Sequence, residues 1–248
     1  MKSKSQKKRL DVLMLELGLA ESRQKAQAMI LAGEVSMNGV KQEKAGAQVS
    51  ETARIEVSSR LQKYASRGGL KLEGALADFS VGLANSVCLD LGSSTGGFTD
   101  CLLQHGAARV YAVDVNVDQL AWRLQRDPRV IRIERNAREL QTDDVSEPID
   151  LVVADVSFIS VTKILGPAVR AAKAGAIFLI LIKPQFELRR EDVGAGGIVK
   201  EPALHKKAIA SVKKHAQESG LEVLDVLPSR LTGAEGNQEF FLYARKIQ

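Results

Sequence analysis

Four charged residues stand where buried segments of the chain should simply turn. Asp155 ends the apolar run LVVAD, Lys183 follows the run FLILI, and Glu239 opens the last apolar segment after GNQ. Lys71 lies on a helical segment that precedes the first strand of the predicted sheet. The carboxyl ends of parallel strands converge on one crevice, and an antiparallel last strand brings its amino end to the same edge. The pattern predicts two lysines and two carboxylates around one partly dry site.

Such a set of side chains is suited to activating a poor nucleophile such as an alcohol. Desolvation and a neighbouring ammonium lower the pKa of a lysine, whereas carboxylates raise it and orient the side chain. We expect Lys183 to accept the hydroxyl proton, with Lys71 as the neighbouring charge. Asp155 would hold Lys183 and position the donor of an in-line displacement, and Glu239 would complete the hydrogen bonds around the hydroxyl. The alternative is structural: lysines at strand ends extend to water, and aspartates cap turns.

The stretch VCLDLGSSTGGFT, residues 87–99, predicts where a cofactor would bind. A short apolar run ends at a glycine, small residues follow, and an amphipathic helix then begins. Small residues allow close approach to the backbone, and the first helical N–H groups point at the ligand. Asp114, at the end of the next apolar run, is placed for ribose hydroxyls. The loop lacks the pattern G-x-G-x-x-G that is typical of dinucleotide binding. Its absence favours a nucleoside cofactor that has no pyrophosphate. An ordinary glycine-rich turn is the alternative.

Apolar strands alternate with helical patterns in the part of the chain that must position these residues. This alternation is typical of an α/β fold with a mostly parallel sheet that is covered on both faces. The last two strands are separated only by a loop, which predicts an antiparallel final strand. The predicted strands are 87–91, 109–113, 129–133, 149–154, 175–182, 221–227 and 239–244. The predicted helices are 71–79, 97–105, 117–126, 161–173 and 202–219. Trp122 is expected to pack rather than to stack on a base, and the glycine-rich loop 189–200 is either a lid or a simple crossover.

The N-terminal quarter differs from the rest of the chain in charge and in pattern. Residues 1–65 hold twelve Lys/Arg and seven Asp/Glu, so the net charge of +5 lies there and the remainder is neutral. Two helices, 10–20 and 22–32 with Ser22 as N-cap, precede a hairpin at Asn38-Gly39. A basic helix-helix-hairpin module attached to a neutral body favours a polyanion-binding unit. A two-helix docking module or a solvated basic tail are the alternatives.

Several classes of protein are disfavoured by the composition. Cys88 and Cys101 lie in apolar segments without metal-like spacing, so we expect reduced core thiols and no metal. The basic N-terminus lacks an apolar signal segment, and the longest apolar run, residues 176–182, is too short to span a bilayer. We therefore expect a cytoplasmic protein that does not bind membranes.

Specific motifs in these segments resemble known families. The pattern D-L-G-x-x-x-G-G-F resembles the first motif of Rossmann-like S-adenosylmethionine (SAM) methyltransferases, and L-x-x-x-G-L-A-x-S-R-x-x-A with G-x-V-x-x-N-G resembles the S4 RNA-binding module. Over nearly the whole chain the sequence resembles the TlyA family of ribosomal RNA 2′-O-methyltransferases, many of which carry the label haemolysin. The tracts that carry this resemblance are SRGGLKLEGAL, DLGSSTGGFTDCLL, AVDVNVDQLAWRL, LVVADVSFIS, LIKPQFE, VGAGGIVKEP and GNQEFF.

The resemblance implies a domain organisation and a set of functional residues. It implies an S4-like RNA-binding domain over 1–60, a linker over 61–70, and an FtsJ-like, SAM-dependent methyltransferase domain over 71–248. The family's K-D-K-E catalytic tetrad falls on Lys71, Asp155, Lys183 and Glu239. The implied cofactor-binding residues are Asp90, Gly92, Ser93, Thr95, Gly96, Gly97, Phe98, Asp114, Asn116 and Asp155. The implied RNA-binding residues are Arg23, Gln24, Lys25, Asn38 and Arg67.

The resemblance also implies the reaction and its partner. The expected substrate is ribosomal RNA or a ribosomal subunit, in which a ribose 2′-hydroxyl attacks the methyl group of SAM. The chain ends at Gln248, like the family's shorter form, which is associated with large-subunit RNA alone. The expected target is therefore a cytidine of large-subunit RNA, and small-subunit RNA stays open as a further target. Asn116-Val117-Asp118 departs from the glycine and tyrosine expected after Asp114. A non-catalytic ribosome assembly factor and a membrane-active haemolysin are the alternative functions.

Overall fold

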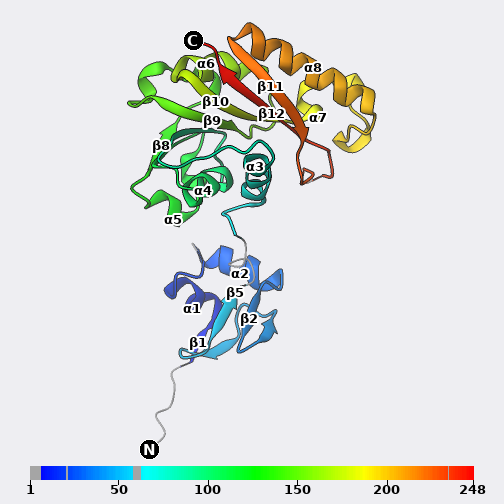
Figure 1. The fold of residues 1–248 in the computed structure, drawn as a ribbon. Coiled ribbons are helices and arrows are strands. Elements are labelled where there is room, and N and C mark those ends of the chain that lie inside the picture. Colours follow the sequence, from blue (N-terminus) through cyan, green and yellow to red (C-terminus); the bar gives the residue numbers. More distant parts are fainter. Residues whose placement is uncertain (1–6, 21, 58–62, 234) are drawn as a thin grey trace, which may run out of the picture. The chain divides into compact units, whose positions relative to one another are not determined.

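The computed structural model describes residues 7–20, 22–57, 63–233 and 235–248 (Figure 1). The chain divides into two compact units, Met1–Lys63 and Tyr64–Gln248, which are described separately below. Within the described ranges, no helix is long and apolar enough to cross a membrane.

The N-terminal unit is a small α+β module with its own apolar core. Leu10, Met14 and Ile30 lie at the centre of this core, fully buried. The Ser22 hydroxyl accepts a hydrogen bond from the Lys25 N–H at 3.1 Å and caps the second helix as predicted. Two further short strands, β1 and β4, were not predicted. The elements are β1 (Lys7–Arg9), α1 (Leu10–Glu16), α2 (Arg23–Leu31), β2 (Val35–Met37), β3 (Val40–Gln42), β4 (Gln48–Ser50) and β5 (Ile55–Val57).

The predicted hairpin of this unit is confirmed. Strands β2 and β3 pair antiparallel across Asn38-Gly39, and both turn residues have positive φ (48° and 80°), as a tight two-residue turn requires. Strand β5 joins the other side of β2, and β1 pairs with β4 in a separate ribbon. The turn therefore presents Asn38 at an exposed tip.

The larger unit is built on a seven-stranded sheet of order β11-β12-β10-β9-β6-β7-β8, in which β12 runs antiparallel to its two neighbours. This confirms the predicted α/β class and the antiparallel last strand. The strands are β6 (Val87–Leu91), β7 (Arg109–Asp114), β8 (Val130–Glu134), β9 (Ile149–Ala154), β10 (Ala172–Ile182), β11 (Leu221–Pro228) and β12 (Phe240–Lys246).

Helices cover both faces of this sheet (Figure 1). One core contains the apolar residues of α6 and α8, and the other contains those of α3, α4 and α5. Cys88 and Cys101 are buried in the second core and form no disulfide bond, as expected. The helices are α3 (Arg67–Asp78), α4 (Gly97–Gln104), α5 (Trp122–Gln125), α6 (Thr162–Ala171), α7 (Pro184–Glu187) and α8 (Pro202–Glu218). Short 3-10 turns are η2 (Val117–Gln119), η3 (Ala137–Glu139), η4 (Thr142–Asp144), η5 (Arg190–Asp192) and η6 (Ala195–Gly197).

The predicted linker over 61–70 is too long at its carboxyl end. Residues 61 and 62 lie outside the described residues, but Tyr64 is 2% exposed in the core of the larger unit. The Ala65 N–H donates to the Asp100 carboxylate at 2.7 Å, and helix α3 begins at Arg67 rather than at residue 71. Residues 64–70 therefore belong to the larger unit.

The predicted helix over 117–126 is also wrong. The chain makes a 3-10 turn, becomes extended at Leu120 and Ala121, and forms one helical turn at α5. The Ala121 N–H donates to the Thr95 carbonyl at 3.1 Å, so a tertiary bond to the glycine-rich loop replaces the helical one. Trp122 is 54% exposed, so the expectation that it packs in the core is wrong, while Leu120 and Leu124 are buried.

Candidate active site

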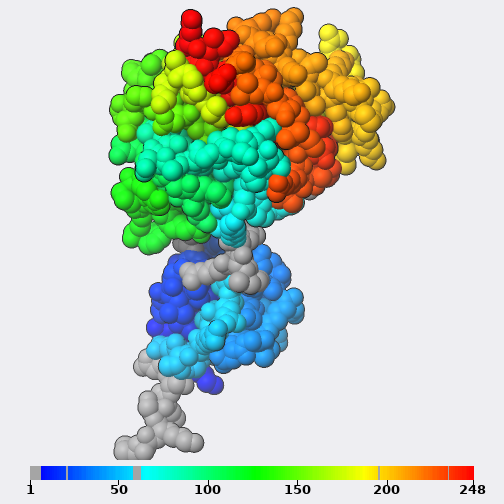
Figure 2. Space-filling view, in the orientation of Figure 1, coloured from blue at the N-terminus to red at the C-terminus, as the bar shows by residue number. Residues whose placement is uncertain are grey.

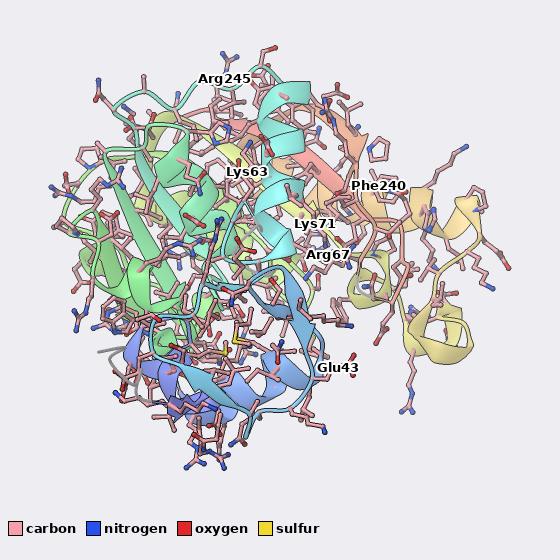
Figure 3. All side chains as sticks on the ribbon, turned by 90° about the horizontal axis from the view of Figure 1, so that it is seen from below. Glu43, Lys63, Arg67, Lys71, Phe240 and Arg245 are labelled. Atoms are coloured by element: carbon pink, nitrogen blue, oxygen red, sulfur yellow. The ribbon has the colours of Figure 1, made fainter. Side chains whose placement is uncertain are left out.

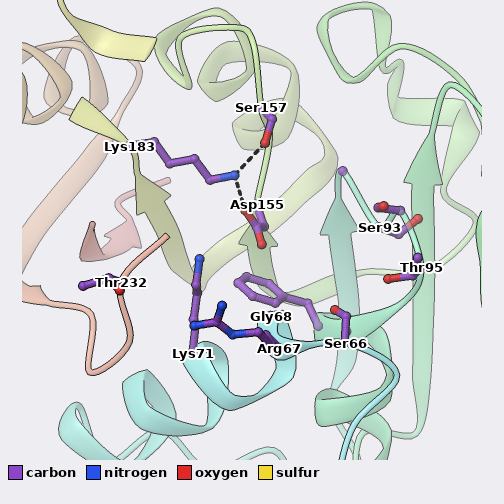
Figure 4. A pocket seen from close by; sticks show the side chains of 14 residues that line it. Ser66, Arg67, Gly68, Lys71, Ser93, Thr95, Asp155, Ser157, Lys183 and Thr232 are labelled. Carbon is purple, nitrogen blue, oxygen red and sulfur yellow. Dashed lines mark hydrogen bonds and ion pairs between the residues drawn. The ribbon is translucent and has the colours of Figure 1, made fainter. Parts of the chain in front are cut away.

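A cavity of about 220 Å³ opens at the carboxyl edge of the large sheet (Figure 4). Its walls come from the start of α3, the loop between β6 and α4, the segment after β9, the end of β10 and the loop before β12. The lining residues are Ser66, Arg67, Gly68, Lys71, Gly92, Ser93, Ser94, Thr95, Gly97, Phe98, Asp155, Ser157, Lys183 and Thr232.

One lysine–carboxylate pair stands on the parallel strands of the sheet. Lys183 follows β10 and Asp155 follows β9, and these neighbouring parallel strands end at the same edge. The Lys183 Nζ lies 2.6 Å from the Asp155 carboxylate and donates to the Ser157 hydroxyl at 2.7 Å (Figure 4). Lys183 is 8% exposed, so its ammonium is held almost out of water by two fixed oxygens.

The second pair joins the first helix of the unit to the last strand. Lys71 lies one turn after Arg67 on α3 (Figure 3), and its Nζ is 2.5 Å from the Glu239 carboxylate. Both side chains are buried, and they are separated by 168 residues of sequence. The Glu239 carbonyl accepts from the Ser229 N–H at 2.8 Å, which closes the loop before β12. Lys71 also lines the cavity, so the structure brings all four predicted charged residues to one site.

The glycine-rich loop is packed so tightly that side chains would not fit. Gly92 has φ +82°, and a Cβ there would lie 2.9 Å from the Asp155 carbonyl. A Cβ at Gly97 would lie 2.1 Å from the Ser66 hydroxyl. Because real Cβ atoms do not approach this closely, these glycines hold the loop against both the Asp155 segment and the start of α3.

Six of the predicted cofactor residues line the cavity: Gly92, Ser93, Thr95, Gly97, Phe98 and Asp155. Four do not. Gly96 instead faces Leu120 and Leu124, and Asn116 is exposed and caps the turn at η2. Asp114 receives the Ser94 N–H at 2.9 Å and the Asn116 N–H at 3.1 Å, which fixes the end of β7 against the loop.

Asp90, the fourth, is buried beneath the loop and does not line the cavity. The Thr99 hydroxyl donates to its Oδ2 at 2.6 Å, while Oδ1 has no hydrogen-bond partner among the described residues. Burial raises the pKa of the Asp90 carboxyl to about 7. Through its bond to Thr99, Asp90 ties strand β6 to the first turn of α4.

Several cavity residues were not predicted from the sequence. Ser66 and Gly68 lie just before Lys71, and Ser157 lies two residues after Asp155, so proximity to the predicted set was the available signal. Ser94 lies between predicted loop residues. Thr232 had no such signal, because it reaches the cavity from a loop that only the tertiary fold places there.

Phe158 is a further residue that sequence reasoning missed. It follows the cavity residue Ser157, has φ +66°, and is 88% exposed. Its ring lies 5.4 Å from the ring of Phe186, centroid to centroid. Positive φ is a strained conformation for a bulky residue, and such strain concentrates at functional sites. An open aromatic face beside the cavity is suited to stacking on a base.

The glycine-rich segment 194–199 is tied to the site by Asn237. The Asn237 side chain is 1% exposed, accepts from the Val199 N–H at 2.8 Å, and donates to the Gly197 carbonyl at 2.9 Å. Because Asn237 lies two residues before Glu239, this end of the segment and the catalytic candidate are held together. The end of the segment at Gly197 and Val199 is therefore anchored, and a lid would have to break both bonds.

Four of the predicted RNA-binding residues lie in the N-terminal unit. Arg23, Gln24 and Lys25 form the exposed first turn of α2, and Asn38 stands at the hairpin tip. The Arg23 guanidinium donates to the buried Asp11 carboxylate at 3.0 Å. Hydrogen bonds from Arg9 and other donors hold the pKa of Asp11 well below its usual range. Arg67, by contrast, belongs to the larger unit and lines its cavity.

No group of His, Cys, Asp and Glu side chains within the described part of the chain is arranged to hold a metal ion.

Comparison with known proteins agrees with both units. Residues 64–246 match the model of the FtsJ-like methyltransferase family, and residues 8–55 match that of the S4 domain. The 16S/23S rRNA (cytidine-2′-O)-methyltransferase TlyA of Mycobacterium tuberculosis is 44% identical over 96% of this chain and 89% of its own. Hemolysin A of Brachyspira hyodysenteriae is 42% identical over 95% of this chain and 98% of its own.

A solved structure extends the similarity to three dimensions. A protein from Streptococcus thermophilus described as a hemolysin is 38% identical, with a TM-score of 0.75 over 98% of this chain and 90% of its own. These findings point to the same group of proteins: two family matches in the expected order, a relative that is 44% identical over 96% of this chain, and a similar solved fold. The chain belongs to the TlyA family, whose members join an S4 domain to an FtsJ-like methyltransferase domain.

Proposed function

We propose that this protein transfers a methyl group from SAM to the ribose 2′-hydroxyl of a cytidine in ribosomal RNA. The observation that carries the proposal is the meeting of two lysine–carboxylate pairs, one buried and one with a half-buried carboxylate, at one cavity beside a glycine-rich loop. The activity named for the M. tuberculosis relative supports the choice of ribose, cytidine and ribosomal RNA. Large-subunit RNA, with small-subunit RNA as a further target, is the substrate that we propose to test first.

The cavity residues fit a nucleoside cofactor that carries a positively charged sulfur. The Ser93 hydroxyl is 4% exposed and has no hydrogen-bond partner among the described residues, so it can bond to a ligand. Gly92 and Gly97 hold the loop backbone in place at the cavity wall. Asp114 does not line the cavity itself, but it ends β7 next to this loop, at the strand end suited to ribose hydroxyls. When bound, SAM supplies an electrophilic methyl group for a single in-line displacement.

The four charged residues have distinct roles in this proposal. Lys183, in its unprotonated form, accepts the proton of the ribose hydroxyl at Nζ. Asp155 and Ser157 fix the position of that nitrogen through contacts of 2.6 and 2.7 Å. Lys71 supplies a second positive charge at the cavity wall, and Glu239 holds it in place. Because each lysine is buried and in contact with a carboxylate, its orientation is fixed before substrate binds, which is how positioning contributes to rate.

The N-terminal unit would supply affinity for the RNA. Its exposed α2 turn and hairpin tip carry Arg23, Lys25 and Asn38, and the S4 match is to an RNA-binding class of module. Guanidinium and ammonium groups bind phosphates without reading sequence. We infer that this unit anchors the ribosomal RNA, that the larger unit acts on it, and that the protein works in the cytoplasm.

The direct test is to map ribose 2′-O-methylation across ribosomal RNA from cells with and without the gene. We expect the loss of at least one methylated cytidine, restored by the wild-type gene and not by a Lys183→Ala gene. An unchanged methylation map, together with SAM binding by the purified protein, would instead favour a non-catalytic assembly factor. Methylation of a base rather than a ribose would contradict the proposed chemistry.

A further inference from the structure

One segment of the larger unit carries arginine at every third position. Between Trp122 and Leu140 the sequence reads WRLQRDPRVIRIERNAREL. It holds six of the chain's 17 arginines and none of its 18 lysines, although the larger unit is neutral overall. A solvated surface needs only charge, and lysine and arginine supply it equally. Exclusive use of arginine points to a ligand that rewards the planar guanidinium group. The six residues are Arg123, Arg126, Arg129, Arg132, Arg135 and Arg138.

These arginines follow one edge of the large sheet. Arg123 lies on α5, Arg132 on β8 and Arg138 on η3, and the other three arginines lie in the connections between these elements. Strand β8 is an edge strand that pairs only with β7. In the space-filling view the green chain that includes these elements forms part of the outer surface of the larger unit (Figure 2). All six arginines are exposed or half-buried. The segment therefore presents its guanidinium groups to solvent along the edge.

Three of the arginines pair closely with carboxylates, one forms a long ion pair, and two form none within the described part of the chain. Arg123 pairs with Asp100, Arg129 with Asp127, and Arg135 with Asp144. Arg132 reaches Asp118 only at 3.5 Å, and the Asp118 side chain is 83% exposed. Arg126 and Arg138 form no ion pair within the described part of the chain.

An exposed aromatic ring completes the surface. The guanidinium carbon of Arg126 lies 3.8 Å from the centroid of the Trp122 ring, and Trp122 is 54% exposed. A stacked pair of this kind offers one flat face and several N–H donors, which suits a nucleotide better than an acidic protein. The Ala121 N–H donates to Thr95, so this pair begins one residue from a direct contact with the cavity loop.

We propose that this arginine edge, defined as Trp122 with Arg126, Arg132 and Arg138, is a second RNA-binding surface that contacts the phosphate backbone flanking the target nucleotide. The inference rests on the proposed function, because it takes ribosomal RNA as the polyanion. The proposed surface adds an RNA contact on the larger unit, whose neutral net charge does not indicate that it binds RNA. The S4 domain would anchor the RNA, and the arginine edge would align the nearby strand with the cavity.

The test compares two full-length double variants that each remove two positive charges. Arg126→Gln/Arg138→Gln alters the arginine edge, and Lys206→Gln/Lys213→Gln alters exposed lysines on α8, which covers the other face of the sheet. We would measure binding to large ribosomal subunits purified from cells that lack the gene, at salt concentrations between 50 and 200 mM. Over this range the affinity of a protein that makes several phosphate contacts falls by about 10³ or more. Circular dichroism and thermal unfolding check that both variants fold like the wild type.

We expect the arginine variant to lower the slope of log affinity against log salt by about one to two, and the lysine control to leave it unchanged. Trp122→Ala should weaken binding while leaving that slope unchanged, because a ring makes no ionic contact. Equal slopes in the two double variants would overturn the proposed surface. Methyl transfer to the same particles is measured in parallel: absence of transfer by the wild type contradicts the proposed function, whereas normal transfer with equal slopes contradicts only the arginine edge.

Discussion

Lys183 differs from the other charged residues of the cavity because its nitrogen contacts both a carboxylate and a hydroxyl. If it accepts the hydroxyl proton, Lys183→Arg retains the positive charge but loses a group that can act as a base, since guanidinium stays protonated. We expect both Lys183→Arg and Lys183→Ala to lower methyl transfer at least about 10²-fold. SAM affinity, measured by calorimetry, should stay within a few-fold of the wild type. Normal turnover by either variant would remove Lys183 from the role of base.

The raised pKa of Asp90 predicts how the stability of the protein depends on pH. Burial raises its pKa to about 7 in the folded chain, whereas an unfolded aspartate has a pKa of about 3.9. Between these values the folded state keeps a proton that the unfolded state has lost, so this group makes the protein less stable as pH rises from about 4 to 7. Asp90→Asn should remove that part of the pH dependence. The stability of the variant minus that of the wild type should therefore be larger at pH 8 than at pH 5.

The measurement is the midpoint of urea unfolding at several pH values, with the exposed Asp143→Asn as the matched control. The control should follow the wild-type pH dependence. If Asp90→Asn and the wild type change in parallel between pH 5 and pH 8, the Asp90 carboxyl titrates normally and the structural role assigned to it is wrong.

The loop from Ser229 to Glu239 shows how an element positions a single carboxylate. A Cβ at Gly233 would lie 2.7 Å from Oε1 of Glu239, whose other oxygen is bonded to Lys71. We expect Gly233→Ala to push the Glu239 carboxylate out of place and to lower methyl transfer about tenfold or more, because small misplacements are costly in a preorganised site. Gly82→Ala is the control, since a Cβ there has no heavy atom within 4 Å.

The comparison is of single-turnover rates at saturating SAM, with thermal unfolding as a check on both variants. Gly82→Ala should match the wild type in rate and in unfolding temperature. Full activity of Gly233→Ala would show either that the loop adapts or that the placement of Glu239 matters little to the reaction.

The strands and the four charged residues of the site could be predicted from the sequence because buried segments consist of apolar residues. Apolar runs such as 149–154 are buried on both faces, and a charged residue that ends such a run is conspicuous. The glycine-rich loop was equally visible, and five of its predicted cofactor residues line the cavity. These features are local in sequence, so residue types alone carried them.

The features that could not be predicted depend on bonds between distant segments. The helix expected over 117–126 is broken because Ala121 bonds to Thr95, 26 residues earlier. Asn237 holds Gly197 and Val199 across 38 to 40 residues, and Thr232 reaches the cavity on the same loop. Tyr64 packs into the larger unit, although its sequence setting looks like a linker. In each case tertiary contacts override local pattern.

At the scale of the whole molecule, charge and chemistry are divided between two units. The basic surplus lies in the N-terminal quarter, where buried Asp11 orients Arg9 and Arg23 through hydrogen bonds of 2.9 to 3.0 Å. The neutral larger unit places two lysine–carboxylate pairs at the cavity, and near the edge strand β8 it carries arginines that form a long ion pair or none among the described residues. In the proposed function, the main anchor for RNA would lie in one unit and the chemistry in the other.

This division predicts that the N-terminal unit dominates the salt dependence of RNA binding. Removing residues 1–60 should weaken binding to ribosomal RNA and flatten the slope of log affinity against log salt, because those residues hold the surplus of positive charge. A full-length Arg23→Gln/Lys25→Gln variant tests the same point while leaving both units in place, and it should lower the slope by about one to two. Lys206→Gln/Lys213→Gln is again the matched control. If the deletion and the control give the wild-type slope, the N-terminal unit does not anchor the RNA, and the methyltransferase unit must bind its substrate through its own surface.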